Sequence, residues 1–177
     1  MGLKAGQLNP RAEVRANGET RVNSVRLIRA QSAENWEQAK VLVNEYADSL
    51  EFDLDFQDFE TEIEVLHKEY GPPAGCFLLA VQDANTVGCV ALRRLDRQSC
   101  EMKRLYVRSQ HRGRGTGHLL AQAIIEVARE LGYKRMRLDT VPSMQSAQAL
   151  YTSLGFGPID PYRYNPIPGT QFMELEL

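Results

Sequence analysis

The stretch VRSQHRGRGTG, residues 107–117, decides the fold of this chain. Its three glycines, Gly113, Gly115 and Gly117, stand directly before a segment whose apolar residues recur with helical spacing up to Leu131. The residues before it, 100–107, have the pattern of a strand. The sequence therefore predicts a strand that passes through a glycine-rich turn into a helix over residues 117–131.

The glycine-rich turn has the features of a phosphate-binding loop. Glycines let backbone N–H groups approach a ligand closely, and the start of a helix adds a positive dipole. No acidic residue occurs between Glu101 and Glu126, although five basic ones do: Lys103, Arg104, Arg108, Arg112 and Arg114. A turn with solvated arginines is the simpler alternative, but the helix and the local excess of basic charge favour a pyrophosphate ligand.

Two common nucleotide-binding motifs fit the loop poorly. The chain has no Gly-Lys-Ser or Gly-Lys-Thr, which a P-loop needs. A GxGxxG motif counted from Gly113 meets His118 at the third glycine, and one counted from Gly115 meets Leu120. Asp139 stands where a ribose-binding acid would follow the next strand, so a nicotinamide enzyme remains a minor alternative.

Strands and helices alternate through the rest of the chain. We expect a strand at 24–29, helices around 36–47 and 59–66, a hairpin of 76–81 with 86–92, a strand at 136–139, a helix at 143–154 capped by Ser143, and a strand at 171–177. Residues 1–23 are polar and aperiodic, and are expected to form a mobile arm. The prediction is one mixed α/β (α+β) domain over residues 24–177.

Two motifs resemble the GNAT superfamily of acyl-CoA-dependent N-acetyltransferases. Arg112-x-x-Gly115-x-Gly117 is similar to its [QR]-x-x-G-x-[GA] loop, and AQALYTSLGF, residues 147–156, is similar to its A-x-x-L-Y-x-x-x-G-F segment. They occur in the family's order, separated by the expected helix and strand. The resemblance implies a mixed, mostly antiparallel sheet flanked by helices, with acetyl-CoA as co-substrate and direct transfer to an amine.

The resemblance also implies roles for individual residues. Tyr151 would be the general acid, and Glu101, acting directly or through a water, or else Asp139, would be the general base. Met144 stands where many members carry an asparagine that contacts the cofactor. A bulge in the strand could open the slot for the cofactor. The cofactor-binding residues would be the backbone of Leu105, Tyr106 and Val107 for the pantetheine arm, and Arg112, Gly113, Arg114, Gly115, Thr116, Gly117 and His118 for the pyrophosphate.

The acceptor is less well defined by the sequence. Residues 51–64 contain seven Asp or Glu and no Lys or Arg, with interleaved phenylalanines, which would suit a cationic amine. A solvated acidic helix start explains the same pattern. Tyr162 and Tyr164 lie in a late loop that could cover the same mouth. Polyamines, aminoglycosides, amino acids and peptide termini all remain open.

Composition excludes several other classes of protein. The 177 residues carry a formal net charge of −2, unlike a protein that binds nucleic acid through bulk charge. Cys76, Cys89 and Cys100 form no CxxC pair, so we expect no metal site and no disulfide, but reduced, buried thiols in the cytoplasm. No stretch is apolar enough to span a membrane. A non-catalytic acyl-CoA sensor is the alternative function, and a homodimer through the last strands is compatible with the pattern.

Overall fold

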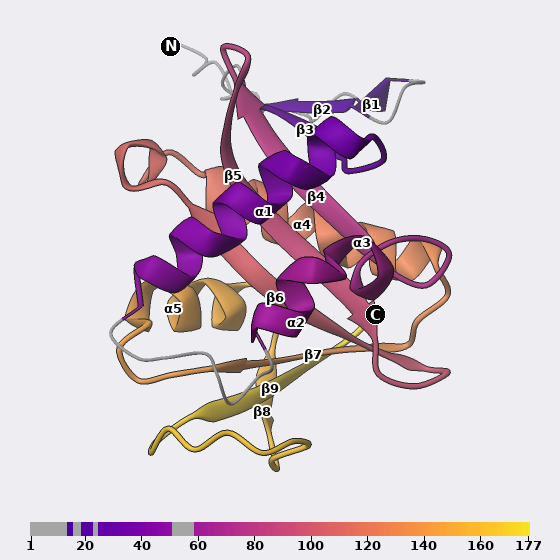
Figure 1. The fold of residues 1–177 in the computed structure, drawn as a ribbon. Coiled ribbons are helices and arrows are strands. Elements are labelled where there is room, and N and C mark those ends of the chain that lie inside the picture. Colours follow the sequence, from indigo (N-terminus) through magenta and orange to yellow (C-terminus); the bar gives the residue numbers. More distant parts are fainter. Residues whose placement is uncertain (1–13, 16–18, 23–24, 51–58) are drawn as a thin grey trace, which may run out of the picture.

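The computed structural model describes residues 14–15, 19–22, 25–50 and 59–177, with side chains described from residue 25 onward. The strands form one sheet in the order β1-β2-β3-β4-β5-β6-β7-β9-β8 (Figure 1). β6 and β7 pair in parallel, and the other neighbouring strands pair antiparallel. The mixed, mostly antiparallel sheet expected from the sequence is confirmed.

The strands occupy the segments that the apolar patterns predicted. Those with a predicted counterpart are β3 (Val25–Arg29), β4 (Cys76–Gln82), β5 (Asn85–Arg94), β6 (Ser99–Val107), β7 (Arg135–Thr140) and β9 (Gln171–Glu176). β8 (Gly157–Ile159) is too short to show a pattern of its own. The expected arm, residues 1–23, lies mostly outside the described residues. Its described parts are two short strands, β1 (Val14–Arg15) and β2 (Glu19–Val22).

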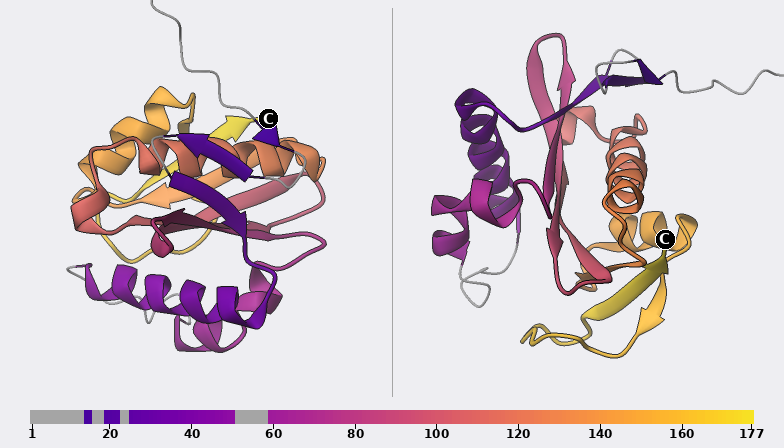
Figure 2. Two further views of the ribbon diagram at one scale, coloured as in Figure 1. Left: turned by 90° about the horizontal axis from the view of Figure 1, so that it is seen from above. Right: turned by 90° about the vertical axis from the view of Figure 1, so that its right-hand side faces the viewer.

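The helices cover both faces of the sheet. α1 (Ala33–Asp48), α2 (Phe59–Glu64) and α3 (Leu66–Glu69) lie on one face, and α4 (Thr116–Glu130) and α5 (Gln145–Ser153) lie on the other (Figure 2). Each face has its own apolar core, one around Leu42, Leu66 and Phe77, and one around Leu120, Ile124 and Leu138. No helix in the described ranges is both long and apolar enough to cross a membrane.

Two local expectations need correction. The helix predicted around 59–66 is two short helices, α2 and α3, which meet at Val65. Ser143 does not cap the next helix, because α5 begins at Gln145 with Met144 as its N-cap and with no side-chain hydrogen bond at the cap. The residues between Val141 and Gln145 instead form a turn closed by the Met144 N–H on the Val141 carbonyl.

The strand before the glycine loop carries a bulge. The β5–β6 register shifts between Cys89 and Ala91, so that Val90 faces two residues of β6, and Arg104 takes a left-handed φ of 56°. The Cys89 thiol donates a hydrogen bond to the Arg104 carbonyl across this irregularity. A bulge bends its strand and interrupts the ladder, as the sequence pattern of β6 suggested.

On its other side, β6 separates from β7 after Glu101, before the bulge is reached. β6 and β7 pair only from Ser99↔Arg135 to Glu101↔Arg137, and each strand then continues without the other. The backbone of Leu105, Tyr106 and Val107 therefore has no partner strand on the β7 side in the described part of the chain. A gap in a parallel pair exposes backbone donors and acceptors to whatever enters it.

Candidate active site

The glycine loop forms as the sequence predicts. After β6, a short 3₁₀ turn at Ser109–His111 leads to Gly113 and Gly115, which have left-handed φ values of 73° and 84°. α4 begins at Thr116 with Gly115 as its N-cap, and no side chain caps it. The first N–H groups of a 15-residue helix are thus directed at the loop with no competing side-chain acceptor.

Basic side chains hold this loop on the sheet. Arg108 donates to both oxygens of Glu45, at 2.8 and 2.6 Å, and to the Thr86 carbonyl. Arg112 donates from Nε to the Val107 carbonyl at 2.7 Å, and its guanidinium lies 5.7 Å from the centre of the Tyr106 ring. Arg112, Arg114 and His118 are exposed around the helix start, where they can meet an anion.

A cavity of about 520 Å³ extends from the loop into the gap between β6 and β7. It is lined by Tyr46, Ser49, Leu50, Leu105, Tyr106, Val107, Arg112 and residues 143–147. Met144 lines it at the position where the resemblance expected asparagine. The three residues that the sequence assigned to a pantetheine arm therefore line one cavity together with Arg112, the first of the residues assigned to a pyrophosphate.

Tyr151 is fixed by the end of α5. Gly155 has a φ of 94°, the Phe156 N–H donates to the Tyr151 carbonyl, and the Gly155 N–H donates to the Thr152 carbonyl. This double hydrogen bond is a Schellman ending, and the rings of Phe156 and Tyr151 meet edge to face at 5.8 Å. The Gly-Phe of the second motif thus sets the position of its tyrosine.

A second, smaller cavity lies against Tyr151. Its volume is about 70 Å³, and Tyr46, Leu105, Met144 and Ala147 line it as well as the larger cavity. Burial, with smaller contributions from Tyr46 and Asp139, raises the pKa of Tyr151 above its ordinary value of 10.0. The phenol is therefore neutral at neutral pH, and its burial makes it a weaker acid than a free tyrosine.

The two candidate bases differ in their placement. Glu101 is fully buried and accepts hydrogen bonds from Arg93 Nε and Tyr162 Oη, each at 2.8 Å. Asp139 accepts from Arg163 Nη2 at 2.6 Å and Asn165 Nδ2 at 2.7 Å. Asp139 lines the small cavity, whereas the described lining of neither cavity includes Glu101.

Three basic residues of the small cavity were not anticipated as acceptor-site residues. Lys103 and Arg104 come from β6, and Arg163 comes from the loop between β8 and β9. Arg104 donates from Nε and Nη2 to the two oxygens of Glu62, at 2.8 and 2.6 Å, and Tyr70 donates to the same carboxylate at 2.7 Å. For Lys103 and Arg104, the available signal is the absence of acidic residues between Glu101 and Glu126, which the sequence analysis attributes to the cofactor alone. Arg163 lies outside that stretch.

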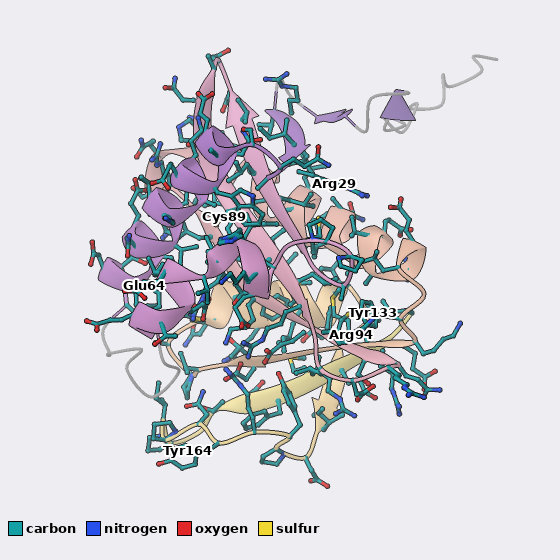
Figure 3. All side chains as sticks on the ribbon, turned by 45° about the vertical axis from the view of Figure 1, so that its right-hand side comes forward. Arg29, Glu64, Cys89, Arg94, Tyr133 and Tyr164 are labelled. Atoms are coloured by element: carbon teal, nitrogen blue, oxygen red, sulfur yellow. The ribbon has the colours of Figure 1, made fainter. Side chains whose placement is uncertain are left out.

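The segment expected to form an acidic mouth for a cationic amine, residues 51–64, is only partly described. Residues 51–58 lie outside the described residues. Of the remainder, Glu62 is 6% exposed and engaged by Arg104, so its charge is balanced inside the protein. Tyr162 turns inward to Glu101, whereas Tyr164 is 78% exposed at the outer edge of the molecule (Figure 3).

Comparison with known proteins identifies the fold as that of an acetyltransferase family. Residues 36–156 match the model of the acetyltransferase (GNAT) family, so the chain belongs to this family. It is 43% identical over 140 residues to an uncharacterized N-acetyltransferase of Schizosaccharomyces pombe, covering 78% of this chain and 86% of that protein. It is 35% identical over 99 residues to human N-acetylaspartate synthetase, covering 55% of this chain and 33% of that protein.

Solved structures share the fold. An acetyltransferase from Streptococcus agalactiae superposes with a TM-score of 0.72 at 21% identity, covering 88% of this chain and all of that one. A GNAT acetyltransferase from Elizabethkingia anophelis with acetyl-CoA bound has a TM-score of 0.65 at 19% identity, with 88% of this chain and 100% of that one covered. The protein is thus a GNAT N-acetyltransferase with the fold expected from its sequence.

Proposed function

We propose that the protein transfers an acetyl group directly from acetyl-CoA to a primary amine. The observation that carries the proposal is the gap between β6 and β7, beside which two neighbouring cavities with shared lining residues lie, the larger against Arg112 and the smaller against Tyr151. A CoA thioester lying there would place its phosphates at residues 112–118 and its arm along Leu105–Val107. The acetyl end of the thioester would then lie at the small cavity, which shares four lining residues with the larger one.

The transfer requires one proton to leave the amine and one to reach sulfur. The neutral amine attacks the thioester carbonyl, a C–N bond forms, the C–S bond breaks, and CoA leaves as a thiolate that takes up a proton. Tyr151 supports the last step because its protonated phenol lines the small cavity. Asp139 is the better placed base, since it lines the small cavity, whereas Glu101 accepts hydrogen bonds from Arg93 and Tyr162.

A covalent acetyl-cysteine is not required by this scheme. Cys76, Cys89 and Cys100 are all buried and free of disulfides. Burial raises the pKa of Cys76 to about 11 and that of Cys100 to about 12, so neither thiol ionises at neutral pH. The reduced thiols also support the cytoplasmic location proposed from the sequence, and a homodimer through the last strands stays part of the same proposal.

The decisive experiment measures CoA thiol release from acetyl-CoA across a panel of amines, with CoA affinity measured in parallel. Tyr151→Phe should lower kcat by roughly 100-fold or more, because it removes the donor of the proton, while CoA affinity stays unchanged. Tyr164→Phe makes the same chemical change on an exposed ring and should leave kcat unaltered.

Two results would contradict the proposed function. Tight CoA binding without turnover on any amine would favour the non-catalytic sensor. Binding of NADH but not of CoA would remove the acetyltransferase assignment itself.

A further inference from the structure

Four residues line both cavities of the candidate site. Tyr46 comes from α1, Leu105 from β6, and Met144 and Ala147 from the start of α5. A thioester with its arm in the larger cavity and its acetyl group in the smaller one would place its carbonyl beside these shared residues. Of the four, Tyr46 is the one whose side chain carries a hydrogen-bond donor, because the other three side chains have no N–H or O–H group.

The Tyr46 side chain is held in place from two directions. It lies in the last turn of α1, where Ser49 Oγ donates to the Tyr46 carbonyl at 2.7 Å. The centres of the Tyr46 and Tyr106 rings lie 6.0 Å apart, and the Arg104 guanidinium lies 5.9 Å from the centre of the Tyr46 ring. Arg104 is itself fixed by its two hydrogen bonds to Glu62. A donor that is already in position needs no reorganisation when charge develops beside it.

The Tyr46 hydroxyl is available to a ligand. The residue is half-buried against the two cavities, and its hydroxyl makes no hydrogen bond within the described ranges of the chain. Burial raises the pKa of Tyr46 above its ordinary value of 10.0, although Arg104 acts in the opposite direction. The phenol is therefore neutral at neutral pH and acts as a hydrogen-bond donor.

Tyr46 and Tyr151 approach the small cavity from opposite layers of the molecule. α1 covers one face of the sheet and α5 covers the other (Figure 2). Both tyrosines line the small cavity, and each is an electrostatic neighbour of Asp139. A thioester held between them would meet one phenol on each side. The proposed function assigns Tyr151 to the sulfur, which leaves the carbonyl oxygen for Tyr46.

We propose that Tyr46 is a second catalytic residue, whose hydroxyl donates a hydrogen bond to the carbonyl oxygen of the thioester. This role rests on the proposed acetyl transfer. When the amine nitrogen bonds to the carbonyl carbon, the π electrons of the C=O bond move onto oxygen, and the hydrogen bond stabilises this oxyanion. When the C–S bond breaks, those electrons form the C=O bond again and sulfur leaves with the C–S pair. Tyr46 keeps its proton throughout, while the amine loses one proton and sulfur gains one.

S-Ethyl-CoA, a thioether without the carbonyl oxygen, tests this contact by binding alone. Calorimetric titration of the wild-type protein without an acceptor should show acetyl-CoA binding about three- to tenfold more tightly than S-ethyl-CoA, as one neutral hydrogen bond predicts. Tyr46→Phe keeps the ring and removes the donor, so it should reduce this ratio by about threefold or more and leave the affinity for S-ethyl-CoA unchanged. If Tyr46→Phe does not fold, the wild-type ratio still decides, because equal affinities would overturn the proposal.

CoA thiol release measures the catalytic part of the role. Tyr46→Phe should lower kcat by roughly 100-fold or more and leave KM for the acceptor unchanged, because the hydrogen bond strengthens as the oxyanion forms. Tyr151→Phe should lower kcat but keep the ratio of the two affinities, since its hydroxyl acts on sulfur. Tyr133→Phe is the matched control, because it removes a buried hydroxyl that donates to the Ala74 carbonyl, and it should change neither kcat nor the ratio.

The outcomes separate the role of Tyr46 from the reaction itself. A Tyr46→Phe variant with wild-type kcat, or with the wild-type ratio of affinities, overturns the role and leaves acetyl transfer standing. A variant that raises only KM for the acceptor also overturns it, and places Tyr46 in acceptor binding instead. CoA binding by the wild-type protein without thiol release for any amine overturns the acetyl transfer and, with it, the role of Tyr46.

Discussion

At the scale of single residues, Arg104 connects the opening of the sheet to the acceptor side. Its left-handed backbone forms the bulge of β6, and its guanidinium reaches Glu62 of α2 in a buried, two-point ion pair. The same guanidinium lies 5.3 Å from the centre of the Phe59 ring and 5.9 Å from that of Tyr46. One residue thus shapes the strand and anchors a helix of the opposite layer.

Removing one member of this pair should be costly. Glu62→Met leaves a buried guanidinium without its partner and should lower the free energy of unfolding by about 3–5 kcal/mol in urea titrations. The double variant Glu62→Met/Arg104→Met should recover most of that loss, because no buried charge remains. Glu126→Met breaks the exposed pair with Arg129 and should cost less than about 1 kcal/mol. Equal losses for the buried and exposed pairs would contradict this view.

The sequence could predict Tyr151 and the glycine loop because both depend on short, local patterns. It could not show that the adjacent residues Lys103 and Arg104 both line the small cavity. Strict alternation along β6 puts Glu101, Lys103, Leu105 and Val107 on one face, but the bulge shifts the register after Lys103. Leu105 and Val107 therefore pack with the α4 core, while Arg104 turns to the helices of the other face. The bond between Arg163 and Asp139 joins residues far apart in the chain, which no local pattern could show.

At the scale of elements, the end of α5 positions the proposed acid. Gly155 adopts a φ of 94°, a conformation that disfavours a Cβ, and an added Cβ would lie 3.4 Å from Leu175. The Schellman ending also places the Phe156 ring against Tyr151. The end of this helix therefore sets the position of the proposed acid.

Gly155→Ala should affect both stability and activity. The left-handed conformation should lower the free energy of unfolding by about 1–2 kcal/mol, and kcat should fall because Tyr151 shifts. Gly157→Ala provides the control two residues later, where an added Cβ meets open space and φ is not left-handed. Urea unfolding and CoA release measured on both variants check the prediction, which fails if the two behave alike.

At the scale of the whole molecule, buried charge links the layers and makes stability depend on pH. Burial alone would raise the pKa of Glu62, but the hydrogen bonds and charge of Arg104, helped by Lys103 and Tyr70, hold it below its ordinary value of 4.5. As pH falls, the unfolded chain takes up this proton before the folded one does. The contribution of Glu62 is therefore fully present above its ordinary pKa and is lost as pH falls through its folded pKa.

The pH dependence should be visible in one variant. Urea unfolding between about pH 7 and about pH 3 should show stability falling below about pH 4.5 in the wild-type protein, and falling less steeply in Glu62→Gln. Gln keeps the shape of the side chain but cannot take up a proton in this range. Parallel slopes for the two proteins would place the acid sensitivity elsewhere.

The bulge at Arg104 also sets a rule for how this chain can change in evolution. Deleting one residue from β6 would remove the register shift against β5 and would turn the side chains after Lys103 to the opposite face, including those of Leu105 and Val107. Length changes should accumulate in exposed connections such as the one between β5 and β6, whereas the span from Ser99 to Val107 should keep its number of residues. The candidate site therefore depends on the number of residues in β6 as well as on their identity.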